Sequence, residues 1–230
     1  VKRLELSQPI LDFDQYDALV GISKSTDGAF DSEVIDITFP QAHGPDGLEQ
    51  ALSAICRKAE SAVQNGKTIL ILSDSKVDSE RVAIPALLAT SGVHHHLVRL
   101  GLRTKTGLVV STGSARETHH FALLAGYGAE AIHPWLAMET LSSVSVQLKE
   151  DADTIHKNYV KAIGKGLNKV MSKMGISTYQ SYCGAQIFEA IGLNTEFIDR
   201  FFTGTSSNVE GIGIQEIAVE SIRYQYSSFW

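Results

Sequence analysis

Short apolar runs rich in β-branched residues alternate with helical patterns across the middle of this chain. The runs at 34–39, 68–72, 108–110 and 131–133 predict strands. Apolar residues spaced three and four apart predict helices at 48–63, 84–100 and 114–125. Strands that alternate with helices in this way predict an α/β fold built from parallel βα units. The periodicity leaves open whether the sheet is open or forms an incomplete, barrel-like curve.

The pattern divides the 230-residue chain into three parts. Residues 1–33 are polar with short apolar clusters, and we expect an irregular lead-in there. Residues 34–140 form the predicted α/β core. Residues 141–230 are expected to be a mostly helical extension of the same domain, after a Ser-rich connection at 141–153. Its helical patterns lie at 160–174, 185–191, 195–202 and 214–222.

Composition excludes several classes of protein. Hydrophobic residues make up 43% of the chain and charged residues 20%, a balance that permits a buried core and does not fit intrinsic disorder. The net charge of −6 argues against a free-standing nucleic-acid-binding protein. Two cysteines are too few for a disulfide framework, which fits a cytoplasmic protein. No apolar run approaches the roughly 20 residues of a membrane span.

Two motifs resemble cofactor or metal sites and are better explained otherwise. Residues 126–131 have the spacing GxGxxA, but they follow a predicted helix and lead into a strand, so they predict a helix end and a turn. His94, His95 and His96 lie on one predicted helix. Consecutive helical residues point about 100° apart, so the three imidazoles cannot face one metal. We therefore expect structural or interface roles and no metal site.

The carboxyl ends of the predicted strands offer an alternative function. Ser114 and Glu117 have the spacing of a capping box, and Arg116 lies between them. A helix start beside an arginine can hold a phosphate or a carboxylate. An independent anion-binding α/β enzyme would use residues of this edge. These are Ser73, Asp74, Gly113, Ser114 and Arg116.

Lysines recur at every fourth position of one predicted helix. They predict a solvated basic face, or a face that meets an acidic neighbouring surface. These are Lys157, Lys161, Lys165, Lys169 and Lys173.

Several longer segments resemble the large chain of glutamate synthase. They are 93–104 (VHHHLVRLGLRT), 114–122 (SARETHHFA), 124–129 (LAGYGA), 169–178 (KVMSKMGIST) and 182–193 (YCGAQIFEAIGL). All of them match the central domain of that enzyme. In the family this domain joins a glutamine amidotransferase domain to a barrel domain that carries FMN, an iron–sulfur cluster and the 2-oxoglutarate site.

The resemblance implies a non-catalytic linker with no cofactor of its own. FMN and the cluster would belong to the parent enzyme, which makes L-glutamate from glutamine and 2-oxoglutarate. The resemblance also implies a scaffold between the glutaminase and FMN domains and a part of the wall of an ammonia tunnel. Cys56 and Cys183 lie too far apart in sequence to ligate a cluster, which needs closely spaced cysteines. The expected partners are the other domains of the same chain, and neither nucleic acid nor a membrane.

Contacts with those domains are expected on the segments that carry the resemblance. The candidate contact residues are His94, His95, His96, Arg99, Arg103, Arg116, Glu117, His120, Lys173 and Gln186.

Overall fold

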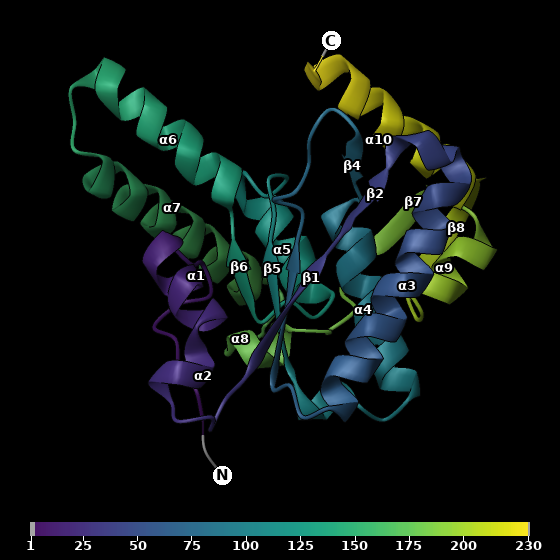
Figure 1. The fold of residues 1–230 in the computed structure, drawn as a ribbon, viewed down its shortest axis with the longest axis horizontal. Helices are drawn as coiled ribbons and strands as arrows, with labels where there is room; N and C mark the ends of the chain where they lie inside the picture. The colour runs from purple at the N-terminus through teal and green to yellow at the C-terminus, as the bar shows by residue number, and fades with distance from the viewer. Residues whose placement is uncertain (1–2, 230) are drawn as a thin grey trace.

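Parallel strands form the central sheet of the computed structural model, which describes residues 3–229. The 4-stranded sheet has the order β1-β3-β5-β6, so neighbouring strands follow one another along the chain (Figure 1). The strands are β1 (Ser32–Asp36), β3 (Ile69–Ser73), β5 (Gly107–Ser111) and β6 (Ala131–His133). Because β1 and β6 are the two ends of this order, the sheet does not close into a barrel. The predicted α/β class with a sheet of parallel strands is confirmed, and the sheet is open.

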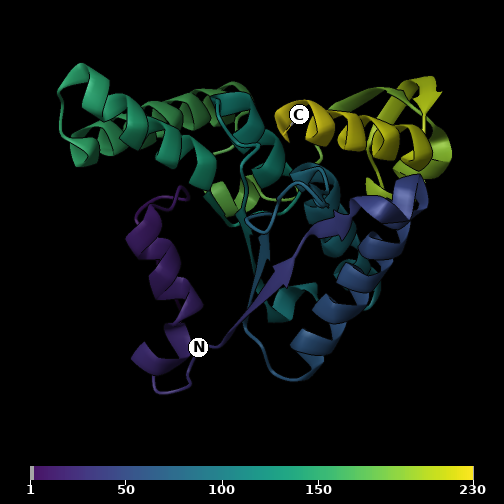
Figure 2. The same cartoon turned by 45° about the horizontal axis from the view of Figure 1, so that its top comes forward.

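Helices cover both faces of this sheet. The connecting helices are α3 (Gly44–Gln64), α4 (Ala86–Arg99) and α5 (Thr118–Gly126). Leu70, Leu72 and Leu108 point toward α3 and α4 and belong to the largest apolar cluster. Alternate residues of the same strands point to the opposite face, where they pack against an N-terminal helix. Figure 2 shows this N-terminal helix and α3 on opposite sides of the sheet.

The N-terminal segment contains two helices between irregular stretches, where the sequence suggested only an irregular lead-in. It contains α1 (Phe13–Val20) and α2 (Ile22–Ser25). Asp12 caps α1, because its carboxylate accepts a hydrogen bond from the amide of Gln15 at 2.8 Å. Before this helix, Ile10 forms a parallel bridge with Ile132 at the β6 edge. The residues just before α1 are thereby attached to β6.

The predicted strand at 34–39 is split into two strands that belong to different sheets. After β1, β2 (Thr38–Pro40) pairs antiparallel with β4 (Arg81–Ala83), which the sequence analysis missed. The Asp36 carboxylate accepts hydrogen bonds from the Thr38 amide at 2.9 Å and from the Thr38 hydroxyl at 2.7 Å. These local bonds fix the chain where it leaves the main sheet.

The Ser-rich stretch 141–153 is mostly helical and not the connection that we predicted. It continues α6 (Trp135–Leu148), which packs against α7 (Ala152–Lys173) as a hairpin. The hydroxyls of Ser142, Ser143 and Ser145 donate to backbone carbonyls one turn earlier, so their polar groups are satisfied within the helix. Lys149, with a left-handed backbone, ends α6.

The predicted helix at 185–191 is wrong. Residues 185–188 are irregular, and β7 (Glu189–Leu193) follows them. It pairs in parallel with β8 (Ser206–Ile212) through the crossover helix α9 (Thr195–Phe201). Gly184 and Gln186 adopt positive φ angles of 74° and 53°, which a helix cannot contain.

The remaining elements complete the fold around this core. α10 (Ile214–Phe229) packs along α3, and the short α8 (Tyr179–Tyr182) lies after α7. Single-turn 3₁₀ helices occupy η1 (Gln41–His43) and η2 (Arg103–Lys105). The apolar stripe of α7 is confirmed at Ile163, Leu167 and Met171, whereas Met174 is 47% exposed beyond the end of that helix.

Candidate functional site

A row of polar side chains crosses the carboxyl edge of the main sheet. Strand register aligns Asp36 with Ser73, Ser73 with Ser111, and Ser111 with His133. The alternation along each strand puts the row on the same face as Ile71 and Val109, the face that α1 covers. This edge is where α/β proteins usually bind ligands, so the row is the first place to look for chemistry.

The N-terminal helix closes one end of this row. His133 is only 2% exposed, and its ring stacks on Tyr16 at a centroid distance of 4.5 Å. Phe13 meets the same ring edge-on at 5.0 Å, and the Leu11 carbonyl lies 3.0 Å from Nδ1. Burial lowers the pKa of His133, although the Leu11 carbonyl and nearby carboxylates oppose the shift. A neutral imidazole packed between aromatic rings is a structural group. Sequence analysis missed it, although its place at the end of the fourth predicted strand was a usable signal.

Asp74 organises the backbone just beyond the row. Its carboxylate accepts hydrogen bonds from the Thr112 hydroxyl at 2.5 Å, the Gly113 amide at 3.0 Å and the Trp135 indole at 2.6 Å. These donors follow β5 and β6, so one side chain joins the ends of three strands. Burial raises the pKa of the Asp74 carboxyl, against the opposing effect of these hydrogen bonds.

The structure brings together only some of the residues of the alternative anion site. Asp74, Gly113 and Ser114 meet through Thr112, whose hydroxyl is 2.9 Å from that of Ser114. The Ser73 hydroxyl instead bonds to that of Ser75 at 3.0 Å. The Arg116 side chain is exposed, and its backbone carbonyl accepts from the Tyr159 hydroxyl at 2.9 Å.

The predicted capping box between Ser114 and Glu117 is wrong. Helix α5 begins at Thr118, with Glu117 as its N-cap. Nδ1 of His120 accepts hydrogen bonds from the amides of Arg116 at 3.1 Å and Glu117 at 3.4 Å. Ser114 lies four residues before the helix begins, and its hydroxyl pairs with that of Thr112, so it does not cap this helix.

The three consecutive histidines of α4 point to different neighbours. His94 accepts through Nδ1 from Nε of Arg103 at 3.1 Å, and burial lowers its pKa to about 4. His95 is buried at 8% exposure, and His96 lies 3.1 Å from the carboxylate of Glu60. Within residues 3–229, no group of three or more His, Cys, Asp or Glu side chains is arranged to hold a metal ion.

Arg103 is fully engaged inside the chain. Its guanidinium donates to the Thr106 carbonyl at 2.6 Å, the Gly128 carbonyl at 2.9 Å and the Glu130 carboxylate at 2.8 Å, besides its bond to His94. The other candidate contact residues divide by exposure. Arg99, Arg116, Glu117, Lys173 and Gln186 are exposed, and His94, His96, Arg103 and His120 are half-buried.

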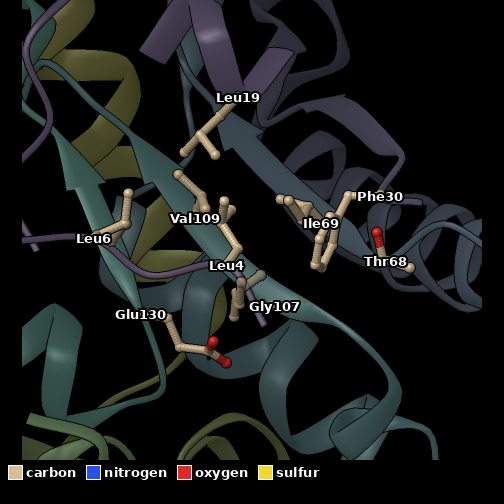
Figure 3. A pocket seen from close by; sticks show the side chains of 11 residues that line it. Leu4, Leu6, Leu19, Phe30, Thr68, Ile69, Gly107, Val109 and Glu130 are labelled. Carbon is tan, nitrogen blue, oxygen red and sulfur yellow. The ribbon is translucent and has the colours of Figure 1, made fainter. Parts of the chain in front are cut away.

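The opposite, amino edge of the sheet holds an apolar pocket that the sequence did not predict (Figure 3). Its volume is about 210 Å³, and Leu4, Leu19, Phe30 and Val109 contribute to its lining. Among residues 3–229, Glu130 is the only charged lining residue, and its carboxylate is bound to Arg103. The described lining is therefore apolar, with its one acid already paired.

The sequence matches a known family. A model of the "Glutamate synthase central domain" family matches residues 1–194. The chain is 45% identical over 225 residues to the glutamate synthase (NADPH) large chain of Bacillus subtilis, which covers 97% of this chain and 14% of that protein. It is 42% identical over 229 residues to the glutamate synthase (NADH) of Saccharomyces cerevisiae, covering 95% of this chain and 11% of that protein.

A plant relative and a solved structure extend the comparison. Ferredoxin-dependent glutamate synthase 2, chloroplastic, of Arabidopsis thaliana is 39% identical over 244 residues, covering 100% of this chain and 15% of that protein. A mandelate oxidase variant has a TM-score of 0.47 at 11% identity, over 75% of this chain and 59% of that chain. A likeness this low supports no conclusion about function.

These relatives are much longer than the chain, which spans between 11% and 15% of their length. No helix of residues 3–229 is long and apolar enough to cross a lipid bilayer. The family match covers most of the chain, and the similarity to the three enzymes extends through nearly all of it. The chain therefore belongs to the glutamate synthase central domain family.

Proposed function

We propose that this chain is the non-catalytic central region of a glutamate synthase, the enzyme that makes L-glutamate from glutamine and 2-oxoglutarate. It separates the amidotransferase and FMN-binding regions of the same large chain and contributes to the wall of an ammonia tunnel between them. The observation that carries this proposal is the covered carboxyl edge of the sheet. His133, at the end of β6, is buried beneath Phe13 and Tyr16 of α1, at the edge where barrel enzymes hold their substrates.

The titratable groups of the chain support a structural role. Burial raises the pKa of Cys56 to about 11 and that of Cys183 to about 12, so both thiols stay protonated at neutral pH. A protonated thiol is a poor nucleophile and a poor metal ligand. The two cysteines lie on α3 and after α8, and they do not fit an iron–sulfur cluster. In this proposal the cluster and FMN belong to other regions of the large chain.

A rigid spacer is useful to such an enzyme because ammonia must pass between two reactions without dilution. Confinement keeps its local concentration high and prevents loss to water. The exposed candidates Arg99, Arg116, Glu117, Lys173 and Gln186 are the side chains that we assign to contacts with the neighbouring regions. His120 supports two of them, because it accepts hydrogen bonds from the amides of Arg116 and Glu117.

A chimeric enzyme tests this proposal. The corresponding region of the Bacillus subtilis large chain is replaced by this chain, and glutamine hydrolysis is measured together with glutamate formation. We expect the chimera to make glutamate. Arg116→Ala should then raise the ratio of glutamine hydrolysed to glutamate formed, because ammonia escapes. Arg57→Ala, which removes an exposed arginine from α3, is the matched control and should leave the ratio unchanged.

Two results would contradict the proposal. An inactive chimera that is folded would show that the chain cannot serve as the central region. If the ratio of glutamine hydrolysed to glutamate formed stays normal in both Arg116→Ala and His120→Ala, these residues do not couple the two reactions.

The alternative is an independent enzyme that binds an anion at the carboxyl ends of the strands. The geometry disfavours it, because the Asp74 carboxylate already occupies the Gly113 amide that an anion would need. Thermal unfolding with inorganic phosphate distinguishes the two functions. A ligand present at one hundred times its Kd adds about 2.7 kcal/mol to the free energy of unfolding. We expect no shift in Tm, and a shift of several degrees would favour the alternative.

A further inference from the structure

The two-stranded sheet of β7 and β8 is exposed to a degree that parallel strands seldom are. Its strands pair in parallel, and among residues 3–229 no third strand joins them. Parallel sheets are almost always covered on both faces, and an isolated pair of strands is marginally stable in water. Figure 1 shows the pair at the margin of the molecule, beside α9 and away from the four-stranded sheet.

Only one face of this sheet is covered. Ala190 and Leu193 of β7 pack against the largest apolar cluster. The other face carries Ile191 and Val209, which are register partners and are 74% and 52% exposed. Ile212, at the end of β8, is 41% exposed and is the register partner of Leu193, which packs on the core. Ile191 and Val209 are adjacent β-branched side chains on neighbouring strands and form a small exposed apolar patch.

The outer edge of β8 is also unprotected. Of its residues, only Ser207 is half-buried, and the others are exposed. β8 pairs with β7 alone among the described residues, so its outward amides and carbonyls have no strand partner there. The segment has no lysine or proline, which natural edge strands often use to prevent pairing. Its one charged side chain, Glu210, is bound to the Thr195 amide at 3.0 Å, and the register between β7 and β8 shifts near Ile191. An apolar face next to a free edge is the arrangement that accepts an added strand.

The family comparison indicates what covers this surface. The match to the central domain ends at residue 194, which lies between β7 and β8. The surface therefore joins the matched domain to the residues that follow it. In the relatives, the region similar to this chain is only 11% to 15% of a much longer protein. A segment tethered in the same chain has a high effective concentration at such a surface, and so needs little intrinsic affinity.

We propose that an extended apolar segment from another region of the same glutamate synthase chain pairs with the free edge of β8 and covers Ile191 and Val209. Backbone hydrogen bonds give this contact its affinity, and the apolar side chains fix its register. The proposal rests on the proposed function, since the docking segment belongs to the large chain.

Hydrogen exchange tests this docking directly. Exchange of the amides of β8 is measured in the isolated chain and in the Bacillus subtilis chimera described above. We expect exchange in the chimera to be at least ten times slower at 208–212. Ile191→Lys combined with Val209→Lys should return the exchange rate to that of the isolated chain. Val146→Lys, the same change at a 79% exposed valine of α6, is the matched control.

Several outcomes would contradict the proposed docking of this segment on β8. Equal exchange in the two proteins would show that β8 stays bare in the large chain. If protection arises in the isolated chain as its concentration rises, with a dimer in sedimentation velocity, a second copy is the occupant. Val209→Lys alone is measured as well, in case the double variant does not fold.

Glutamate formation by the unmodified chimera separates this inference from the proposed function. Activity with an unprotected β8 contradicts only the docking. A protected β8 without activity supports the docking and contradicts the role in catalysis by the large chain.

Discussion

His94 links the acid stability of the chain to one buried contact. Its Nδ1 accepts from Arg103, which leaves the imidazole neutral beside a guanidinium. Burial lowers its pKa from 6.5 to about 4, so the unfolded chain takes up this proton at a higher pH than the folded chain. The favourable contribution of the neutral ring is therefore complete above pH 6.5 and is lost as the pH falls toward 4. The pKa values of His95 and His133 are also lowered, and they act in the same direction.

We predict that His94→Gln reduces this acid sensitivity. The amide oxygen of Gln can accept from Arg103 and does not titrate. Between pH 6.5 and 4.5 the wild type should lose up to about 2–3 kcal/mol more stability than the variant, at about 1.4 kcal/mol for each pKa unit. Urea unfolding at several pH values measures the difference. His43→Gln, at an exposed position before α3, is the control, and parallel curves for wild type and His94→Gln would contradict the prediction.

We predict a large effect for Asp74→Ala. The substitution leaves the Thr112 hydroxyl, the Gly113 amide and the Trp135 indole without their shared acceptor. Unsatisfied buried donors cost about 1–3 kcal/mol each, so we expect a loss of roughly 3 kcal/mol after water reaches part of the site. Trp135 fluorescence should report the local change, and chemical denaturation the stability. Asp199→Ala, at an exposed site in α9, should cost less than about 0.5 kcal/mol. A similar loss in both variants would argue against a special role for Asp74.

At the scale of elements, β7 and β8 depend on a close approach of two glycines. A Cβ on Gly211 would clash with the backbone carbonyl of Gly192. The register of the two strands shifts at this point, so the backbones have no room for a side chain. Gly192 itself has a φ of 80°, which favours glycine.

Gly211→Ala should therefore destabilise the chain by about 1–3 kcal/mol through backbone displacement. Gly164→Ala is the matched substitution inside α7, where a new Cβ meets nothing within 4 Å. It should stabilise the chain by about 0.5–1 kcal/mol, because alanine is the better helix former. Thermal unfolding of both variants checks the opposite signs. Equal shifts in Tm would show that the glycine contact is not tight.

The accuracy of the sequence predictions also differs between elements for physical reasons. The strands at 68–72, 108–110 and 131–133 were found because they are buried on both faces and consist mostly of apolar residues. β7 was missed because its partner β8 lies beyond a helix, and only that pairing makes residues 189–193 a strand. The serines of α6 were taken for a connection because their internal hydrogen bonds are invisible in composition.

For the candidate site, the sequence predicted the positions of some residues correctly and did not predict their side-chain contacts. The sequence located Asp74, Gly113 and Ser114 at one edge of the sheet, because strand ends can be found from periodicity. It did not foresee that Asp74 would accept hydrogen bonds from Gly113 and Trp135, since the direction of a side chain at a strand end depends on tertiary contacts. His133 was missed because the helix that covers it had not been predicted.

At the scale of the whole molecule, residues 195–229 lie beyond the family match but contribute side chains to the core. Phe197, Phe201 and Ala218 are buried in the largest apolar cluster, and α10 packs along α3. The matched region therefore does not contain all the apolar groups that cover its own helices.

We predict that a chain ending at residue 194 loses at least 10 °C in Tm and binds the apolar dye ANS, because α3 and α4 lose the cover of α9 and α10. A chain ending at Tyr226 is the control. It lacks only the exposed end of α10 and keeps Gln225, which donates to the Asp78 carbonyl. Cooperative unfolding of the shorter chain at the wild-type temperature would contradict this assignment of the core.

The bridge between Ile10 and Ile132 has a consequence for how the protein is made. Synthesis from the amino end produces Ile10 and Leu11 long before the ribosome adds β6, the strand with which they pair. At roughly 5–20 residues per second, the delay is on the order of ten seconds. During that interval these two apolar residues lack their partner strand, which makes them a target for chaperones that bind nascent polypeptides.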